Sequence, residues 1–301
     1  MSDFEIFDER FGSFVMGNAP VEKLASGFRW VEGPVWFGDG AFLLFSDIPN
    51  DRILRWSEAG LSVFRQPAGF TNGHTRDRQG RLVSCEHGGR RISRTELDGR
   101  VVTLVDRFEG KRLNSPNDVV VKSDGSIWFT DPPYGIMTDY EGDKAESETG
   151  QDVVYRFDPD SGGVAVASTA ALKPNGLGFS PDEKTFYVAD TGRSHHPNWP
   201  FRILAFDVGS DGRTLSSERV FAEIEHGAAD GFRCDEEGNV WTSAGKGVNC
   251  YSADGVLLGR INIPETVANV AFGERKKNRL FICASTSLYS VYLNARGAQF
   301  P

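Results

Sequence analysis

The chain has 301 residues, of which 39% are hydrophobic and 34 are glycine, and its formal net charge is −9. This apolar content excludes an intrinsically disordered chain and suffices for the core of one large domain or two ordinary ones. With 42 acidic against 33 basic residues, the surface has no net attraction for nucleic-acid phosphates or anionic lipid. Neither a nucleic acid nor a membrane is therefore expected as a partner.

The chain begins with an acidic segment, MSDFEIFDERFGSF. This segment lacks the basic stretch, the apolar stretch and the small-residue cleavage site of a secretory signal, so we expect a cytoplasmic protein. No apolar run approaches the roughly 18 residues that span a bilayer. The cysteines lie far apart without zinc-binding spacing and are predicted to be buried free thiols: Cys85, Cys234, Cys250 and Cys283.

Six segments share one pattern, in which a short apolar strand, a polar turn and a second apolar strand follow one another. In chain order they are EGPVWFGDGAFLLFSD from Glu32, NGHTRDRQGRLVSCE from Asn72, NDVVVKSDGSIWFTD from Asn117, NGLGFSPDEKTFYVAD from Asn175, DGFRCDEEGNVWTSA from Asp230 and NVAFGERKKNRLFICA from Asn269. Such segments are typical of β-hairpins. Their starts lie 39 to 58 residues apart, which brackets the spacing of roughly 40 to 50 residues typical of propeller blades.

This repeat predicts an all-β fold, a six-bladed β-propeller in which residues 1–301 form a single domain. Further strand pairs lie between the hairpins, so each blade has room for four strands. Because little chain follows the last hairpin, we expect residues 1–31 to supply its outer strand and to help close the ring. Two insertions, 138–151 and 191–201, interrupt the repeat. They either cover a central pocket or are solvated loops without a role.

Alignment of the six repeats places an oxygen-bearing side chain at the same position in each, a set that we name the polar column: Glu32, Asn72, Asn117, Asn175, Asp230 and Asn269. Each member opens the first strand of its hairpin, so the six converge on the central channel if those strands are innermost. Ca²⁺ prefers carboxylate, amide and water oxygens, whereas zinc or copper would be expected to recruit His or Cys. The polar column therefore predicts a divalent metal site with a central position, for which Ca²⁺ is favoured and Mg²⁺, Mn²⁺, Fe²⁺ or Zn²⁺ are alternatives.

Turn chemistry offers a different interpretation of the polar column. Asn-Gly and Asp-Gly are common where the backbone needs a positive φ, and Asn72, Asn175 and Asp230 each precede glycine. Glu32 and Asn117 fit this interpretation poorly, because Glu has no turn preference and Asn117 is not followed by glycine. The chain contains no serine-hydrolase elbow, phosphate-binding loop or zinc-protease motif.

Four motifs in register, EGPVW, SPND, PNGLGFS and ADGF, resemble those of the SMP-30/gluconolactonase/regucalcin-like family. The resemblance runs from about Glu32 to Phe272, and LNSPND with WFTDPPYG and VADTG is similar to the bacterial gluconolactonase branch. It implies a calcium-type lactonase of carbohydrate metabolism that opens a sugar lactone, such as gluconolactone, to the aldonic acid. Two alternatives stay open: a phosphotriester or fluorophosphate hydrolase on the same metal site, and a non-catalytic binding propeller with a structural ion.

Carried over residue by residue, the resemblance implies metal ligands at Glu32, Asn175 and Asp230, with Asp230 also the acid–base group. Asn117 matches an asparagine that lies beside the metal and contacts substrate, so both roles are expected of it. Ser115 departs from the pattern, because the vertebrate members have an arginine there, and sugar recognition is expected to differ. From their places near strand ends, we expect six residues in the pocket wall: Asn72, His74, Asn114, Asp131, Tyr134 and His195. We expect a monomer or a small homo-oligomer.

Overall fold

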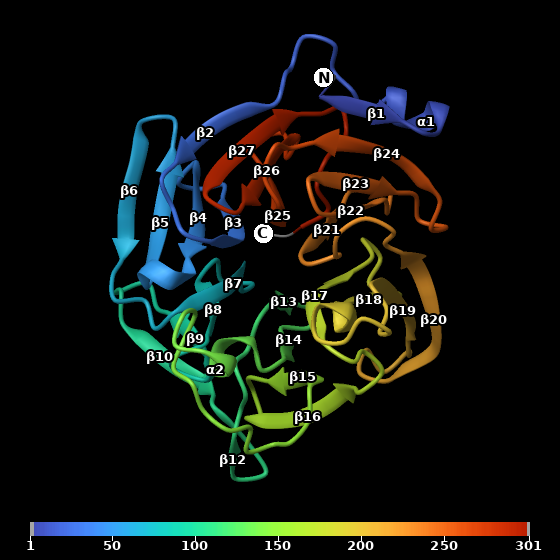
Figure 1. Ribbon diagram of the computed structural model, residues 1–301. Helices are drawn as coiled ribbons and strands as arrows, with labels where there is room; N and C mark the ends of the chain where they lie inside the picture. Colours follow the sequence, from blue (N-terminus) through green and yellow to red (C-terminus); the bar gives the residue numbers. More distant parts are fainter. Residues whose placement is uncertain (1–2, 300–301) are drawn as a thin grey trace.

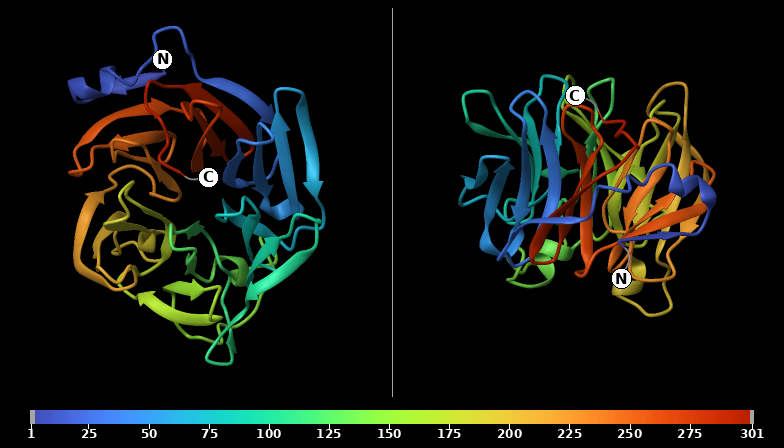
Figure 2. Two further views of the ribbon diagram at one scale, coloured as in Figure 1. Left: turned by 180° about the vertical axis from the view of Figure 1, so that it is seen from behind. Right: turned by 90° about the horizontal axis from the view of Figure 1, so that it is seen from above.

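The computed structural model describes residues 3–299. Six antiparallel sheets stand around a central axis, which confirms the predicted six-bladed β-propeller (Figure 1). Seen from the edge, the sheets form one ring whose strands run mostly along the axis (Figure 2).

The strands of each blade follow one another in the chain from the axis outward. The first three blades comprise β3 (Val31–Phe37), β4 (Phe42–Asp47), β5 (Arg52–Ser57) and β6 (Gly60–Arg65); β7 (Thr71–Arg76), β8 (Leu82–Glu86), β9 (Arg91–Thr95) and β10 (Val101–Val105); and β13 (Val119–Val121), β14 (Ile127–Asp131), β15 (Val153–Asp158) and β16 (Gly163–Ser168). The next two comprise β17 (Pro174–Phe179), β18 (Thr185–Asp190), β19 (Arg202–Val208) and β20 (Leu215–Glu223); and β21 (Phe232–Cys234), β22 (Val240–Ser243), β23 (Gly247–Tyr251) and β24 (Leu257–Asn262). The sixth comprises β25 (Val267–Gly273), β26 (Arg279–Ala284) and β27 (Ser287–Tyr292).

Residues before Glu32 contribute to the last two blades. The strand β2 (Glu22–Ser26) pairs with β27 as the outermost strand of the sixth blade. The strand β1 (Phe4–Ile6) is added outside β24 of the fifth blade. Between them, α1 (Glu9–Gly12) packs Phe11 against Trp241 at 5.9 Å between ring centroids. The beginning and the end of the chain are thus joined by backbone hydrogen bonds.

Large apolar side chains fill the spaces between neighbouring blades. Trp36 of the first blade stacks on Phe281 of the sixth at 5.3 Å between centroids, and Trp128 of the third contacts Phe186 of the fourth at 5.1 Å. Burying one such side chain contributes about 1.5–3 kcal/mol. The four cysteines are buried and free, as expected. Within residues 3–299, no helix is long and apolar enough to cross a membrane.

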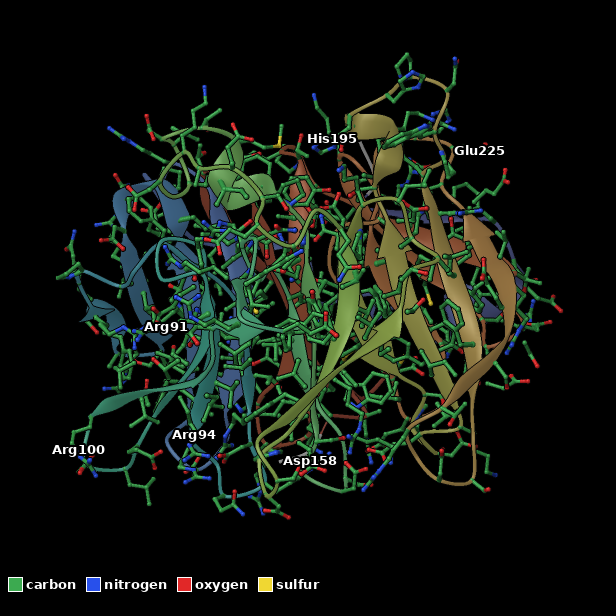
Figure 3. All side chains as sticks on the ribbon, turned by 90° about the horizontal axis from the view of Figure 1, so that it is seen from below. Arg91, Arg94, Arg100, Asp158, His195 and Glu225 are labelled. Atoms are coloured by element: carbon green, nitrogen blue, oxygen red, sulfur yellow. The ribbon has the colours of Figure 1, made fainter. Side chains whose placement is uncertain are left out.

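Short elements outside the blades gather mainly around the two insertions. The helix α2 (Tyr134–Met137) precedes insertion 138–151, and η2 (Gly192–Ser194) lies within insertion 191–201. In Figure 3, His195 lies at one end of the ring, with α2 and η2, whereas Arg94 and Asp158 lie at the opposite end. Both insertions therefore project from the same end. The remaining elements are η1 (Ile48–Asn50) and the small hairpin of β11 (Arg107–Phe108) and β12 (Lys111–Arg112).

Candidate functional site

The innermost strands of successive blades contact one another around the axis: β3, β7, β13, β17, β21 and β25. Each member of the polar column lies near the beginning of one of these strands. Asn117 and Asp230 precede theirs by two residues, and the other four lie within the strands. The fold therefore gathers the polar column at one end of the central channel.

Four innermost strands are irregular where they carry the polar column. Their pairing with the next strand shifts register between Glu32 and Val35, Thr71 and His74, Pro174 and Leu177, and Val267 and Asn269. An extra residue in one strand of an antiparallel pair bends that strand and re-aims a side chain. We infer that these bulges turn the column side chains from the sheet face toward the axis.

Glycine follows four members of the polar column because the adjacent blade occupies the space that a side chain would need. These glycines are Gly33, Gly73, Gly176 and Gly231. A Cβ on Gly176 would lie only 2.2 Å from the carbonyl oxygen of Asp230, which accepts a hydrogen bond from the Gly176 N–H at 2.9 Å. Of the four, only Gly33 has a positive φ, of 55°. The Asn-Gly and Asp-Gly pairs thus reflect close approach of blades instead of turn chemistry.

A cavity of about 210 Å³ opens at this end of the channel. Five members of the polar column line it, and the chain around the insertions adds four polar side chains: Glu32, Asn72, Asn117, Asn175 and Asp230, with Tyr134, Glu141, Thr191 and Ser194. Trp30 and Ala228 complete the wall. Four hollows are larger and are lined by no column residue; two of them, of about 430 and 400 Å³, lie at the other ends of the innermost strands. The volume of a cavity therefore does not identify the functional site here. The convergence of the polar column on one cavity does.

Three carboxyl groups line this cavity, those of Glu32, Glu141 and Asp230, and within residues 3–299 no basic side chain forms an ion pair with any of them. Burial, followed by the nearby charge of Asp230, raises the pKa of Glu32 well above its usual range. Burial, followed by the charges of Asp118 and Glu141, raises the pKa of Asp230 to about 7. The buried Arg233 guanidinium lies 3.6 Å from Asp118 instead. A site of this kind favours a bound cation, which would stabilise the ionised carboxylates of Glu32 and Asp230.

Hydrogen bonds leave Glu32 with one oxygen for the cavity. Its Oε2 accepts from the Gly33 N–H at 2.6 Å and from Asn269 Nδ2 at 3.1 Å. Asn269 Oδ1 in turn accepts from the Val270 N–H at 2.8 Å. Asn269 is therefore a support for Glu32, and it does not line the cavity.

The donor set fits a hard divalent cation. The Asn175 amide tends to lower the pKa of the nearby Asp230 carboxyl group, which is the effect of an N–H₂ group turned toward it and leaves the amide oxygen as an acceptor. Carboxylate and amide oxygens are the ligands that Ca²⁺ and Mg²⁺ accept. No cluster of three or more His, Cys, Asp or Glu side chains that could hold a metal occurs in residues 3–299. A cation here would therefore need the amide oxygens beside Glu32 and Asp230.

Two residues predicted for the pocket wall form hydrogen bonds inside the protein instead of lining the cavity. His74 is fully buried, and its Nε2 and Nδ1 lie 2.8 Å from the hydroxyls of Ser46 and Ser84. Asn114 is also fully buried, and its Nδ2 donates to the carbonyl oxygens of Asp131 and Gln151 at 3.0 and 2.8 Å. Neither side chain is among those that line the cavity.

Asp131 and His195 also lie outside the cavity wall. Asp131 is fully buried and accepts the Asn114 N–H at 2.8 Å, and burial raises its pKa to about 7. His195 is half-buried at the rim, where its ring lies 5.3 Å from that of Tyr134. Tyr134 itself lines the cavity, and its hydroxyl hydrogen-bonds to Thr191, which joins α2 to insertion 191–201.

Sequence reasoning missed five residues of the wall: Trp30, Glu141, Thr191, Ser194 and Ala228. Glu141, Thr191 and Ser194 belong to the two insertions, whose break in the repeat was the only available signal. Ser115, where a different sugar contact was expected, is fully buried. Its hydroxyl donates to the Pro132 carbonyl at 2.7 Å and accepts from the Gly135 N–H at 2.9 Å, so it fixes the start of α2.

The family model described as SMP-30/Gluconolactonase/LRE-like region matches residues 30–286. A gluconolactonase from Zymomonas mobilis is 33% identical, over 95% of this chain and 84% of its own length. A pentonolactonase from Haloferax volcanii is 29% identical, over 84% of this chain and 81% of its own length. The solved structure of a gluconolactonase from Xanthomonas campestris is 40% identical, has a TM-score of 0.89 and covers 96% of this chain and 94% of its own.

Proposed function

The chain belongs to the SMP-30/gluconolactonase/LRE-like family, and from this premise we propose that it is a lactonase that hydrolyses a sugar lactone to the open acid. The observation that carries the proposal is the convergence of five oxygen-bearing column residues on one cavity, in a chain 33% identical to a gluconolactonase over nearly its whole length. We favour an aldonolactone such as gluconolactone as substrate, because polar side chains from both insertions face the same cavity.

Glu32, Asn175 and Asp230 are the proposed ligands of a divalent cation, for which Ca²⁺ is favoured, and Asn117 lies beside them. When bound, such a cation polarises the lactone carbonyl and stabilises the negative charge that develops on its oxygen. The amides of Asn175 and Asn117 are neutral, so the net charge around the cation comes from Glu32 and Asp230.

Asp230 is the proposed acid–base group. Its carboxylate accepts a proton from water as the water oxygen forms a bond to the lactone carbonyl carbon. When the carbonyl re-forms, the bond to the ring oxygen breaks, and Asp230 returns the proton to that oxygen. The products are the carboxylic acid and a hydroxyl group on one chain, and ionisation of the acid lowers the pH of the solution.

The remaining polar wall residues are proposed to bind the substrate. Three of them are also predicted from the sequence to contact substrate: Asn72, Asn117 and Tyr134. Four residues predicted for the wall have side chains that do not line the cavity, and we assign them a role in supporting the wall residues: His74, Asn114, Asp131 and His195. Residues 1–301 are proposed to act as one domain.

A phosphotriester or fluorophosphate hydrolase remains the second proposal, since a cation in this cavity would polarise P=O as it does C=O. The discriminating experiment compares acid release from gluconolactone and from a dialkyl fluorophosphate. We expect turnover of the lactone, and a kcat at least about 100-fold lower in Asp230→Asn, the order of magnitude that a general base contributes. The exposed Asp160→Asn serves as the matched control, with wild-type kcat expected. Turnover of the fluorophosphate alone would contradict the lactonase assignment.

A further inference from the structure

His87 connects the innermost strand of the second blade to insertion 138–151. It follows β8 and is fully buried. Its Nδ1 lies 3.0 Å from the carbonyl oxygen of Glu141, and its Nε2 lies 3.3 Å from Nδ2 of Asn72. Asn72 and Glu141 both line the candidate cavity. One buried imidazole therefore contacts two parts of the cavity wall that are far apart in the chain.

Two glycines, one in α2 and one in insertion 138–151, let these segments approach the imidazole closely. A Cβ on Gly135 would lie 2.4 Å from Cβ and Cγ of His87. A Cβ on Gly142 would lie 3.3 Å from Cβ of His87 and 2.2 Å from the carbonyl oxygen of Gly135. Neither position can accept a side chain without movement of the backbone or of His87. The insertion thus fits closely around His87, and Glu141 is held next to Gly142.

The hydrogen bonds of His87 fix its tautomer. A carbonyl oxygen only accepts, so Nδ1 carries the proton that it donates to Glu141. Burial lowers the pKa of His87 to about 4, so the ring is neutral at pH 7 and Nε2 is an acceptor. Asn72 must then present its Nδ2–H₂ group to Nε2 and turn its Oδ1 away. Among residues 3–299, no group donates to the Oδ1 of Asn72.

Two hydrogen-bonding groups of the cavity are oriented in this way. The Asn72 Oδ1 is kept as an acceptor, and the Glu141 backbone is held where its carboxyl group lines the cavity. Both groups suit the hydroxyls of a polyhydroxylated substrate, and neither belongs to the proposed cation ligands. Changes at His87 should consequently affect substrate binding more than the chemical step.

We propose that His87 is a positioning residue for sugar-lactone binding, acting through Asn72 on one side and Glu141 on the other; the proposal rests on the lactonase function. His87→Asn and His87→Gln separate the two contacts. The Asn amide lies near the place of Nδ1 and can still donate to Glu141, whereas the Gln amide reaches the place of Nε2 and can still accept from Asn72.

The test measures KM and kcat for gluconolactone, with thermal unfolding of each variant, and uses the exposed His226→Asn as control. We expect both His87 variants to raise KM about 10-fold with kcat within about twofold of wild type. Adding Glu141→Gln to His87→Asn should raise KM further, because the Asn amide still donates to the Glu141 carbonyl oxygen. Adding it to His87→Gln should change KM little, because that hydrogen bond is already lost.

A lower kcat at unchanged KM, in step with loss of folded protein, would mean that His87 only stabilises the fold and would overturn the proposal. Should both His87 variants fail to fold, Glu141→Gln alone decides, because this side chain is partly exposed. An unchanged KM in that variant would overturn the proposal. A wild-type protein that opens no lactone would overturn the proposed function and this inference with it.

Discussion

Some polar side chains near the cavity line it, whereas others point into the protein interior. Asp131 and His74 are polar residues that the sequence predicts in the pocket wall, yet both are fully buried. The alternation of side chains along a strand sends successive residues to opposite faces, and a bulge changes this alternation. Because bulges occur at the polar column itself, the sequence pattern could identify the polar residues without determining which of them face the cavity.

Burial of Asp131 predicts a specific pH dependence of stability. Its folded-state pKa of about 7 exceeds the value of about 3.9 for an exposed Asp, so the folded protein binds this proton more tightly between these pH values. The free energy of unfolding should therefore decrease as pH rises from about 4 to 7, by at most about 4 kcal/mol from this group.

Asp131→Asn removes the ionisable group while an amide oxygen can still accept the Asn114 N–H. We expect the free energy of unfolding, measured with urea at pH 5 and pH 8, to differ less between the two pH values in this variant than in wild type. Asp143→Asn, an exposed site in insertion 138–151, should keep the wild-type difference. Equal differences in Asp131→Asn and wild type would contradict the assignment of a buried, protonated Asp131.

At the scale of elements, the β-hairpins were predictable because alternating apolar strands and glycine-containing turns recur locally in the chain. The polar column was predictable for the same reason, since one position of the repeat always carries oxygen. Glu141 was not predictable, because its place depends on His87, which lies 54 residues earlier in the chain. Contacts between an insertion and a distant blade have no local signature.

Close approach between blades makes the glycines that follow four of the column residues a test of the architecture. In Gly176→Ala, the new methyl group would meet the Asp230 carbonyl oxygen, 2.2 Å away. We expect a loss of about 1–3 kcal/mol or more in the free energy of unfolding, together with a lower kcat, because Asp230 would move. Gly17→Ala, with no atom within 4 Å of the added carbon, should change stability by less than about 0.5 kcal/mol. Similar stabilities for the two variants would contradict this explanation of the Asn-Gly pair.

At the scale of the whole molecule, the ring brings residues from every blade to one end of the channel. Glu32 and Asn269 lie 237 residues apart in the chain and are joined by a 3.1 Å hydrogen bond. The pairing of β2 with β27 links the sixth blade to residues before Glu32. A site assembled from separate blades needs this closed arrangement, because no single blade supplies both carboxylates.

We propose that this ring of oxygen donors holds a divalent cation and that lactone hydrolysis requires it. The most direct measurement is the rate of gluconolactone opening by the protein before and after removal of metal with a chelator, with metal content determined on the same samples. We expect about one ion per chain, loss of at least about 100-fold in rate on its removal, and recovery when Ca²⁺ or another divalent cation is added. Full lactone turnover by protein shown to be free of metal would contradict this proposal.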